Sequence, residues 1–198
     1  MIYIFIGILG YVAGLGFDFI LLKKIPRIKL AVWLAGWVFA FFSIIMVSLN
    51  TDKFSMPLWT LYPGWVLFGL GTLFILYALY LNLPFKSTYV NVTKNAGLIK
   101  TGLYALCRHP VNFWINLVMI SLILISRSKL MLIEAPLFII LNTALVVIED
   151  KFIFPQIFTD YKVYQRETPM LLPNVRSIKA FVNTLTNQRV RPEESNEF

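Results

Sequence analysis

The chain has 198 residues, of which 58% are hydrophobic and only 14% are charged. An ordinary soluble domain has about 25% charged residues, so this composition argues against a water-soluble protein. The net charge of +8 could indicate a nucleic-acid partner, but in so apolar a chain it favours loops that face an anionic membrane surface. The single cysteine, Cys107, excludes an intramolecular disulfide and, with one histidine, a closed His/Cys metal site.

Five apolar stretches approach the length of about 20 residues that a helix needs to cross the hydrocarbon core. In chain order they cover residues 2–22, 30–49, 58–83, 111–125 and 130–148. No Lys or Arg precedes the first stretch and no small-residue cleavage site follows it, so we expect a retained span rather than a signal peptide. Only SRSK separates the last two stretches, which predicts a tight helical hairpin. The sequence therefore predicts an all-α integral membrane helical bundle of about five spans, or four if the short segment 111–125 is re-entrant.

Positive charges predict the orientation of this bundle. With five spans, fifteen of the 18 Lys and Arg residues fall on one side of the membrane, and only Lys53, Arg127 and Lys129 fall on the other. We therefore expect an N-terminus outside and a C-terminus in the cytosol. The compact size and the lack of targeting signals favour a bacterial inner membrane.

Small and polar residues inside the predicted spans indicate how the helices pack. Gly7, Gly10 and Gly14 lie roughly along one face of the first span, which favours close helix contact. We expect Asp18 to pair with Lys23 or Lys24, and Glu134 to pair with a basic residue of the SRSK loop. Interhelical hydrogen bonds are expected from Asn116, Ser121 and Asn142.

The composition changes after the fifth span. Residues 149–173 mix charges, aromatic residues and three prolines, which predicts one short helix over about 156–166 and then an extended piece. Ile178, Phe181, Val182 and Leu185 form an amphipathic stripe within 175–189, flanked by basic residues, so we expect a helix in the membrane interface and a frayed tail beyond it. We divide the chain into two N-terminal spans (1–56), a core (57–173) and this interfacial segment with the tail (174–198).

Two charged clusters lie at the cytosolic ends of the predicted hairpin. Arg108 and His109 precede Pro110, which suits the first turn of a helix, and the acidic pair Glu149 and Asp150 ends the fifth span. The hairpin should bring the two clusters together, so that the helix start and Arg108 favour a carboxylate while the acidic pair favours an ammonium. A plainer interpretation has about equal weight: the same residues act only as interfacial anchors, with Arg108 paired to Glu149 and His109 capping a helix.

The stretch GLYALCRHPVNFW, the later ED and the segment FTDYKVYQRETPMLLP resemble a family of integral-membrane methyltransferases. That family includes the isoprenylcysteine carboxyl methyltransferases and the phospholipid methyltransferases. The resemblance covers about residues 60–173. The matching positions are Leu98, Ile99, Gly102, Tyr104, Arg108, His109, Pro110, Glu149, Asp150, Phe158, Tyr161, Tyr164, Pro169, Leu171, Leu172 and Pro173.

The resemblance implies methyl transfer from S-adenosyl-L-methionine to a lipidic or small membrane-soluble acceptor at the cytosolic face. Arg108 and Glu149 are the implied catalytic residues, since Arg108 could position an anionic acceptor and Glu149 could accept a proton from an amine. The implied cofactor contacts are Gly97, Leu98, Ile99, Tyr104, His109, Pro110, Asn112, Glu149 and Asp150.

Several positions depart from the family pattern. Asn112 replaces a tyrosine, Trp114 replaces a small residue and Thr159 replaces a glycine. Leu145 stands where the prenylcysteine enzymes have an arginine, so a different acceptor is expected. Two other functions stay open: an NADPH-dependent membrane reductase, since sterol reductases share a similar segment, and a non-catalytic membrane protein with this fold.

Overall fold

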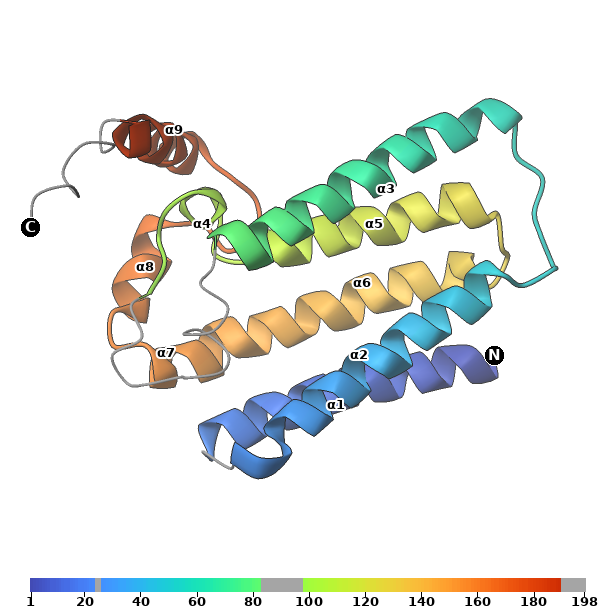
Figure 1. The fold of residues 1–198 in the computed structure, drawn as a ribbon, viewed down its shortest axis with the longest axis horizontal. Coiled ribbons are helices and arrows are strands. Elements are labelled where there is room, and N and C mark those ends of the chain that lie inside the picture. Colours follow the sequence, from blue (N-terminus) through green and yellow to red (C-terminus); the bar gives the residue numbers. More distant parts are fainter. Residues whose placement is uncertain (24–25, 83–97, 190–198) are drawn as a thin grey trace, which may run out of the picture. The chain divides into compact units, whose positions relative to one another are not determined.

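The computed structural model of the protein describes residues 1–23, 26–82 and 98–189, which form helices and turns without a β-strand (Figure 1). The chain groups into two compact units. The first contains Met1–Leu73 and Trp114–Ile157, and the second contains Phe74–Phe113 and Phe158–Phe198. The division into segments 1–56, 57–173 and 174–198 stays a prediction, and the compact units run across its boundaries.

The described part of the chain contains four helical stretches long and apolar enough to cross a membrane: Ile2–Leu22, Leu30–Ser48, Leu58–Asn82 and Met131–Ile157. A fifth apolar helix, Pro110–Ser126, has 17 residues. At 1.5 Å per residue it extends about 26 Å, a little less than the hydrocarbon core of about 30 Å. The predicted all-α membrane bundle is confirmed, and every predicted apolar stretch coincides with a helix.

In the first unit, α1 (Ile2–Leu22) and α2 (Pro26–Ser48) run antiparallel, and both contact α6 (Met131–Ile148) (Figure 1). Glycines allow this approach: a Cβ on Gly10 would lie 2.7 Å from the carbonyl oxygen of Gly36, and one on Gly7 would overlap the ring of Phe138. The predicted glycine contact face is therefore confirmed at these two positions. The buried core of the unit consists of Ile4, Val47, Met119, Met131, Ala135 and Phe138.

A second pair of helices consists of α3 (Leu61–Leu76) and α5 (Pro110–Ser126), of which the residues up to Leu73 and from Trp114 belong to this unit. A Cβ on Gly71 would lie 2.6 Å from Val118, so α3 and α5 pack closely. Asn116 of α5 accepts a hydrogen bond from Asn142 of α6 at 3.1 Å, as predicted. The interhelical prediction for Ser121 is wrong, because its hydroxyl donates to the carbonyl of Val118 in its own helix.

The loop between α5 and α6 corrects the prediction for Glu134. Lys129 pairs with Asp52 at 2.8 Å, and Arg127 donates to the carbonyl of Pro57. Glu134 is fully buried and instead accepts a hydrogen bond from Ser43 of α2. The short side chain of Ser43 therefore bonds Glu134 inside the bundle, whereas Arg127 and Lys129 of the loop interact with Pro57 and Asp52.

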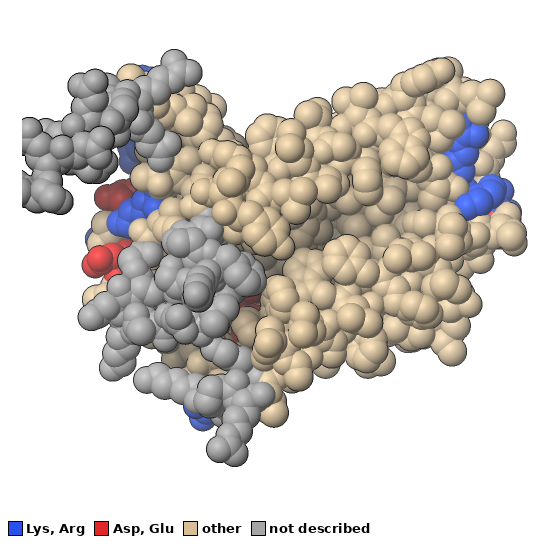
Figure 2. All heavy atoms as spheres, viewed as in Figure 1, with Lys and Arg blue, Asp and Glu red and all other residues tan. Residues whose placement is uncertain are grey.

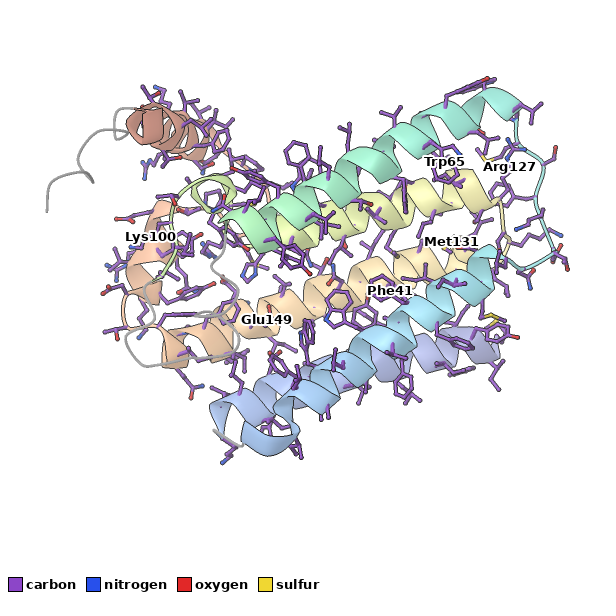
Figure 3. The ribbon with its side chains drawn as sticks, viewed as in Figure 1. Phe41, Trp65, Lys100, Arg127, Met131 and Glu149 are labelled. Carbon is purple, nitrogen blue, oxygen red and sulfur yellow. The ribbon has the colours of Figure 1, made fainter. Side chains whose placement is uncertain are left out.

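The outer surface of the first unit is apolar along its helices. Phe41 and Trp65, labelled in Figure 3, are 55% and 58% exposed. Figure 2 shows a broad uncharged face, with Lys and Arg gathered where α5 turns into α6. So much exposed aromatic surface suits contact with lipid rather than water.

The C-terminal region differs from the prediction of one helix over 156–166. The chain continues from α6 through a π-helical turn, η4 (Glu149–Ile153), into α7 (Phe154–Ile157), and then starts a new helix, α8 (Tyr161–Glu167). Pro155 lies within this continuous helical stretch, and Asp160 is the N-cap residue of α8, without a capping hydrogen bond from its side chain. The predicted amphipathic helix is confirmed as α9 (Val175–Arg189).

Candidate functional site

In the second unit, the segment Arg108–Pro110 lies against the chain that follows α8. The backbone N–H of Arg108 donates to the carbonyl of Pro169 at 2.9 Å, and that of His109 donates to the carbonyl of Met170 at 3.1 Å. Because these bonds use backbone atoms, they fix the register of the two segments independently of their side chains. Two motifs that are distant in the sequence therefore form one local structure.

The side chain of Arg108 closes the C-terminal end of α8. Its Nη1 donates to the carbonyl of Gln165 at 3.0 Å and to that of Thr168. The last carbonyls of a helix lack intrahelical partners and carry a partial negative charge, so a guanidinium stabilises them. The catalytic role of Arg108 stays a prediction, and the structure gives this residue a capping role that the sequence analysis did not expect.

His109 is buried, with 7% of its surface exposed, and lies against an aromatic group formed by Phe158, Tyr161 and Tyr164. Its Nε2 is 3.4 Å from the hydroxyl of Tyr161. The hydroxyl of Tyr164 donates to the carbonyl of Tyr104 at 2.6 Å. The structure therefore brings His109 and Tyr104, two of the predicted site residues, onto the tyrosines of α8.

The other predicted residues of this unit occupy the start of α5 and the chain before α4 (Leu103–Leu106). Pro110 begins α5 as expected, and Asn112 in its first turn is buried. Leu98 and Ile99 are half-buried, and Gly97 lies outside the described residues. The first turn of a helix presents backbone N–H groups and a partial positive charge, which favour an anionic group.

A turn at Gly102 connects this segment to the rest of the unit. Its backbone angles are φ 60 and ψ −136, and a Cβ there would overlap the side-chain oxygen of Asn82. Asn82, the last residue of the π-helical turn η2 (Tyr77–Asn82), donates to the carbonyl of Thr101 at 3.0 Å and accepts from the N–H of Leu103 at 2.8 Å. Asn82 is not among the predicted site residues, and its only signal in the sequence is an amide side chain at the end of an apolar span.

Cys107 lies beside this segment and is buried. Burial raises the pKa of its thiol to about 11, and this effect outweighs the lowering by the backbone N–H of His109 and by the nearby Arg108. The thiol is therefore neutral at physiological pH.

The acidic residues belong to the first unit. Glu149 and Asp150 open η4 at the end of α6 (Figure 3). Asp150 is 3% exposed and Asp18, on α1, is 5% exposed. Both act electrostatically on Glu149, and α1 contacts η4. The predicted acidic pair is thus an acidic trio of Asp18, Glu149 and Asp150, drawn from two helices.

Asp18 does not pair with Lys23, contrary to one of the two predicted pairings. Lys23 lies with its Nζ 5.6 Å from the centre of the Phe19 ring, and Lys24 is outside the described residues. The Oδ2 atom of Asp18 is buried and has no hydrogen-bond partner within the described chain. A signal was present, because Asp18 continues the helical stripe of the glycines and is buried with Gly7 and Gly10.

The structure thus assembles two clusters, one in each unit. The segment around Arg108 and His109 with α8 forms the first, and the acidic trio forms the second. Their expected juxtaposition stays a prediction, because they belong to different units.

Comparison with known proteins places the chain in a family. The all-α fold and the membrane-spanning helices define an integral membrane protein. The model of a family described as "Protein of unknown function (DUF1295)" matches residues 23–168, so the chain belongs to this family. The family falls in the steroid 5-alpha reductase/isoprenylcysteine methyltransferase-like group. Searches of curated proteins and of solved structures found no match.

Proposed function

We propose that this protein transfers a methyl group from S-adenosyl-L-methionine to a lipidic or small membrane-soluble acceptor at the cytosolic face of its membrane. One observation carries the proposal. The resemblance residues Tyr104, Arg108 and His109 are held by hydrogen bonds to Tyr161, Tyr164 and the chain after α8, which are themselves part of the resemblance. The separate parts of the motif therefore contact one another in the folded chain, which supports a shared role.

The chemistry of the two clusters suits this cofactor. Its methionine end has a carboxylate and an ammonium, and its sulfur is a sulfonium. The partial positive charge at the N-terminal end of α5 favours an anion. The buried, unpartnered Oδ2 of Asp18, beside Glu149, suits a cation. The proposed contacts are Gly97, Leu98, Ile99, Tyr104, His109, Pro110, Asn112, Glu149 and Asp150.

The chain's own residues would mainly align the reactants and exclude water, because methyl transfer is an in-line displacement. Such alignment can contribute about 7–11 kcal/mol of the barrier reduction. A carboxylate or thiolate that receives the methyl group needs no base. An amine must lose a proton, and Glu149 or His109 is the base proposed to take it.

The position of Leu145 bears on the identity of the acceptor. Leu145 lies 3.5 Å from the Cβ position of Gly14 on α1, so it packs against a helix as an apolar residue. It cannot supply the positive charge that an isoprenylcysteine carboxylate would need. The proposed acceptor is therefore a different lipid or a small apolar molecule.

Calorimetric titration of the detergent-solubilised protein tests the proposal. We expect S-adenosyl-L-methionine to bind, and His109→Ala and Glu149→Ala to bind much more weakly. Asp52→Asn is the matched control, since Asp52 is an exposed acid outside both clusters. Equal affinity in all variants would remove His109 and Glu149 from the site.

The family group also supports a second candidate, a reductase that uses a nicotinamide cofactor, because it contains steroid 5-alpha reductase-like proteins. Thermal-shift measurements with NADPH and with S-adenosyl-L-methionine separate the two. Stabilisation by NADPH alone would favour the reductase. Stabilisation by neither, with no methyl transfer to a lipid extract, would favour a non-catalytic protein, for which Asn112 and Trp114 are the sequence arguments.

A further inference from the structure

The helix α9 is too short and too polar to be a span. Its 15 residues extend about 22 Å, against a hydrocarbon core of about 30 Å. It contains Arg176 and Lys179, and no acidic residue occurs between Val175 and Arg189. It also lies beyond residue 168, where the family match ends.

One side of α9 is accounted for by the second unit. Ser177, which is 1% exposed, and the half-buried Phe181 and Thr184 recur at i, i+4 and i+7 and so share one side of the helix. The backbone N–H of Gly102 donates to the hydroxyl of Thr184 at 3.3 Å, and α9 contacts α4.

The start of α9 is also well defined. The N–H of Asn174 donates to the Ser177 hydroxyl, and the N–H of Ser177 donates to the Asn174 side chain, both at 2.9 Å. This reciprocal pair is the capping-box arrangement, which fixes the residue at which a helix begins. The helix is therefore both docked and capped, so its remaining sides have defined directions.

A second side of α9 is apolar and exposed. Val175, Ile178, Val182 and Leu185 are 72%, 47%, 52% and 40% exposed. In a helix with 100° between successive residues, these four side chains group together, and the centre of the group lies at least a quarter of a turn from the docked side. The polar sector beyond them contains the exposed Arg176, Lys179, Asn183 and Thr186. A helix with an apolar side next to a basic side and without acids is complementary to an anionic lipid surface.

We propose that α9 lies on the lipid surface of the protein's own membrane. Val175, Ile178, Val182 and Leu185 insert below the headgroups, and Arg176 and Lys179 contact anionic headgroups. The occupant is lipid because the helix is basic and contains no acidic residue, so its charge complements anionic headgroups, and because the same chain carries helices that can span a membrane. The proposal does not depend on the methyltransferase function.

Nitroxide scanning of the full-length protein in lipid nanodiscs tests this proposal. Single cysteines at positions 182 and 183, in a Cys107→Ala background, place a label on the apolar side or on the neighbouring polar side. We expect the label at 182 to collide with oxygen, which concentrates in lipid, and the label at 183 to collide with a water-soluble nickel complex. Equal nickel access at both positions would overturn the proposal. Shielding of 182 from both reagents would also overturn it, and would indicate a second copy of the chain on this side.

Lipid composition tests the headgroup part separately. Each basic residue at an anionic surface contributes about fivefold to partitioning. Adding phosphatidylglycerol to phosphatidylcholine discs should therefore increase the lipid exposure of the label at 182, and Arg176→Gln/Lys179→Gln should abolish the increase. The same lipid exposure with and without phosphatidylglycerol would overturn the role of the basic side.

Discussion

The two clusters are built in opposite ways. In the second unit, the backbone of Arg108 and His109 and the guanidinium of Arg108 all donate to carbonyls of residues 165–170. In the first unit, Asp18 and Asp150 repel Glu149, and the Oδ2 of Asp18 has no partner within the described chain. Hydrogen bonds stabilise the basic cluster, whereas nearby like charges destabilise the acidic trio. One cluster is therefore held together by hydrogen bonds between its own segments, whereas the residues of the other disfavour one another's charged forms.

The largest expected effect comes from Arg108→Ala. It removes two charge-assisted hydrogen bonds to the end of α8, so we expect a loss of about 3 kcal/mol of stability. Thermal unfolding in detergent measures this loss. Arg166→Ala, which removes an exposed arginine of α8, is the control and should have little effect. An equal loss of stability in both variants would contradict the role of Arg108 in capping the C-terminal end of α8.

The second prediction concerns the turn at Gly102. Gly102→Ala forces a side chain into a backbone conformation that suits glycine and into the side chain of Asn82, so it should cost about 2 kcal/mol. Gly69→Ala is the matched control, since a Cβ there meets nothing within 4 Å and alanine favours a helix. Thermal unfolding of the two variants should therefore shift in opposite directions, and equal shifts would contradict the geometry of the turn.

Asp18→Asn sharpens the comparison from the acidic side. Removing the charge of a carboxyl group whose buried Oδ2 has no hydrogen-bond partner within the described chain, beside Glu149, should raise stability by about 1 kcal/mol, or about 2–4 °C for a chain of this size. The same variant should bind S-adenosyl-L-methionine more weakly. Asp52→Asn, which breaks an exposed pair with Lys129, should slightly lower stability and leave binding unchanged. A less stable Asp18→Asn protein would show that Asp18 has a structural partner.

The smallest effect is expected at Cys107. With a thiol pKa of about 11, only about a thousandth of Cys107 is thiolate at pH 8, and the thiol is buried. Iodoacetamide should label it slowly in the folded protein, faster as the pH rises towards 11, and fully in SDS. Rapid labelling of the native protein at neutral pH would contradict the burial of the Cys107 thiol.

Much of the fold could be predicted because lipid imposes length and polarity on helices. The first span begins and ends as expected at Ile2–Leu22. The second helix begins at Pro26 rather than at residue 30, because basic residues at the membrane surface can join the first helical turns. The break between α7 and α8 was missed, since aromatic and charged residues at helical spacing continue across Phe158–Asp160.

The candidate site was less predictable from the sequence. The motif located Arg108 and His109, but the partners of Arg108 are backbone carbonyls, and a carbonyl leaves no trace in residue identity. Asp18 was assigned to a surface pair because Lys23 and Lys24 are near in sequence, whereas its direction on α1 takes it to Glu149. The direction in which Asp18 points from α1, which depends on how the helices pack, therefore decides its neighbour, and distance along the sequence does not.

Calorimetric titration of the purified protein with S-adenosyl-L-methionine tests the central claim most directly. The account predicts binding by the unmodified chain and severe loss in both His109→Ala and Glu149→Ala, variants from different clusters. Absence of binding by the unmodified chain, with binding of NADPH in the same preparation, would contradict it.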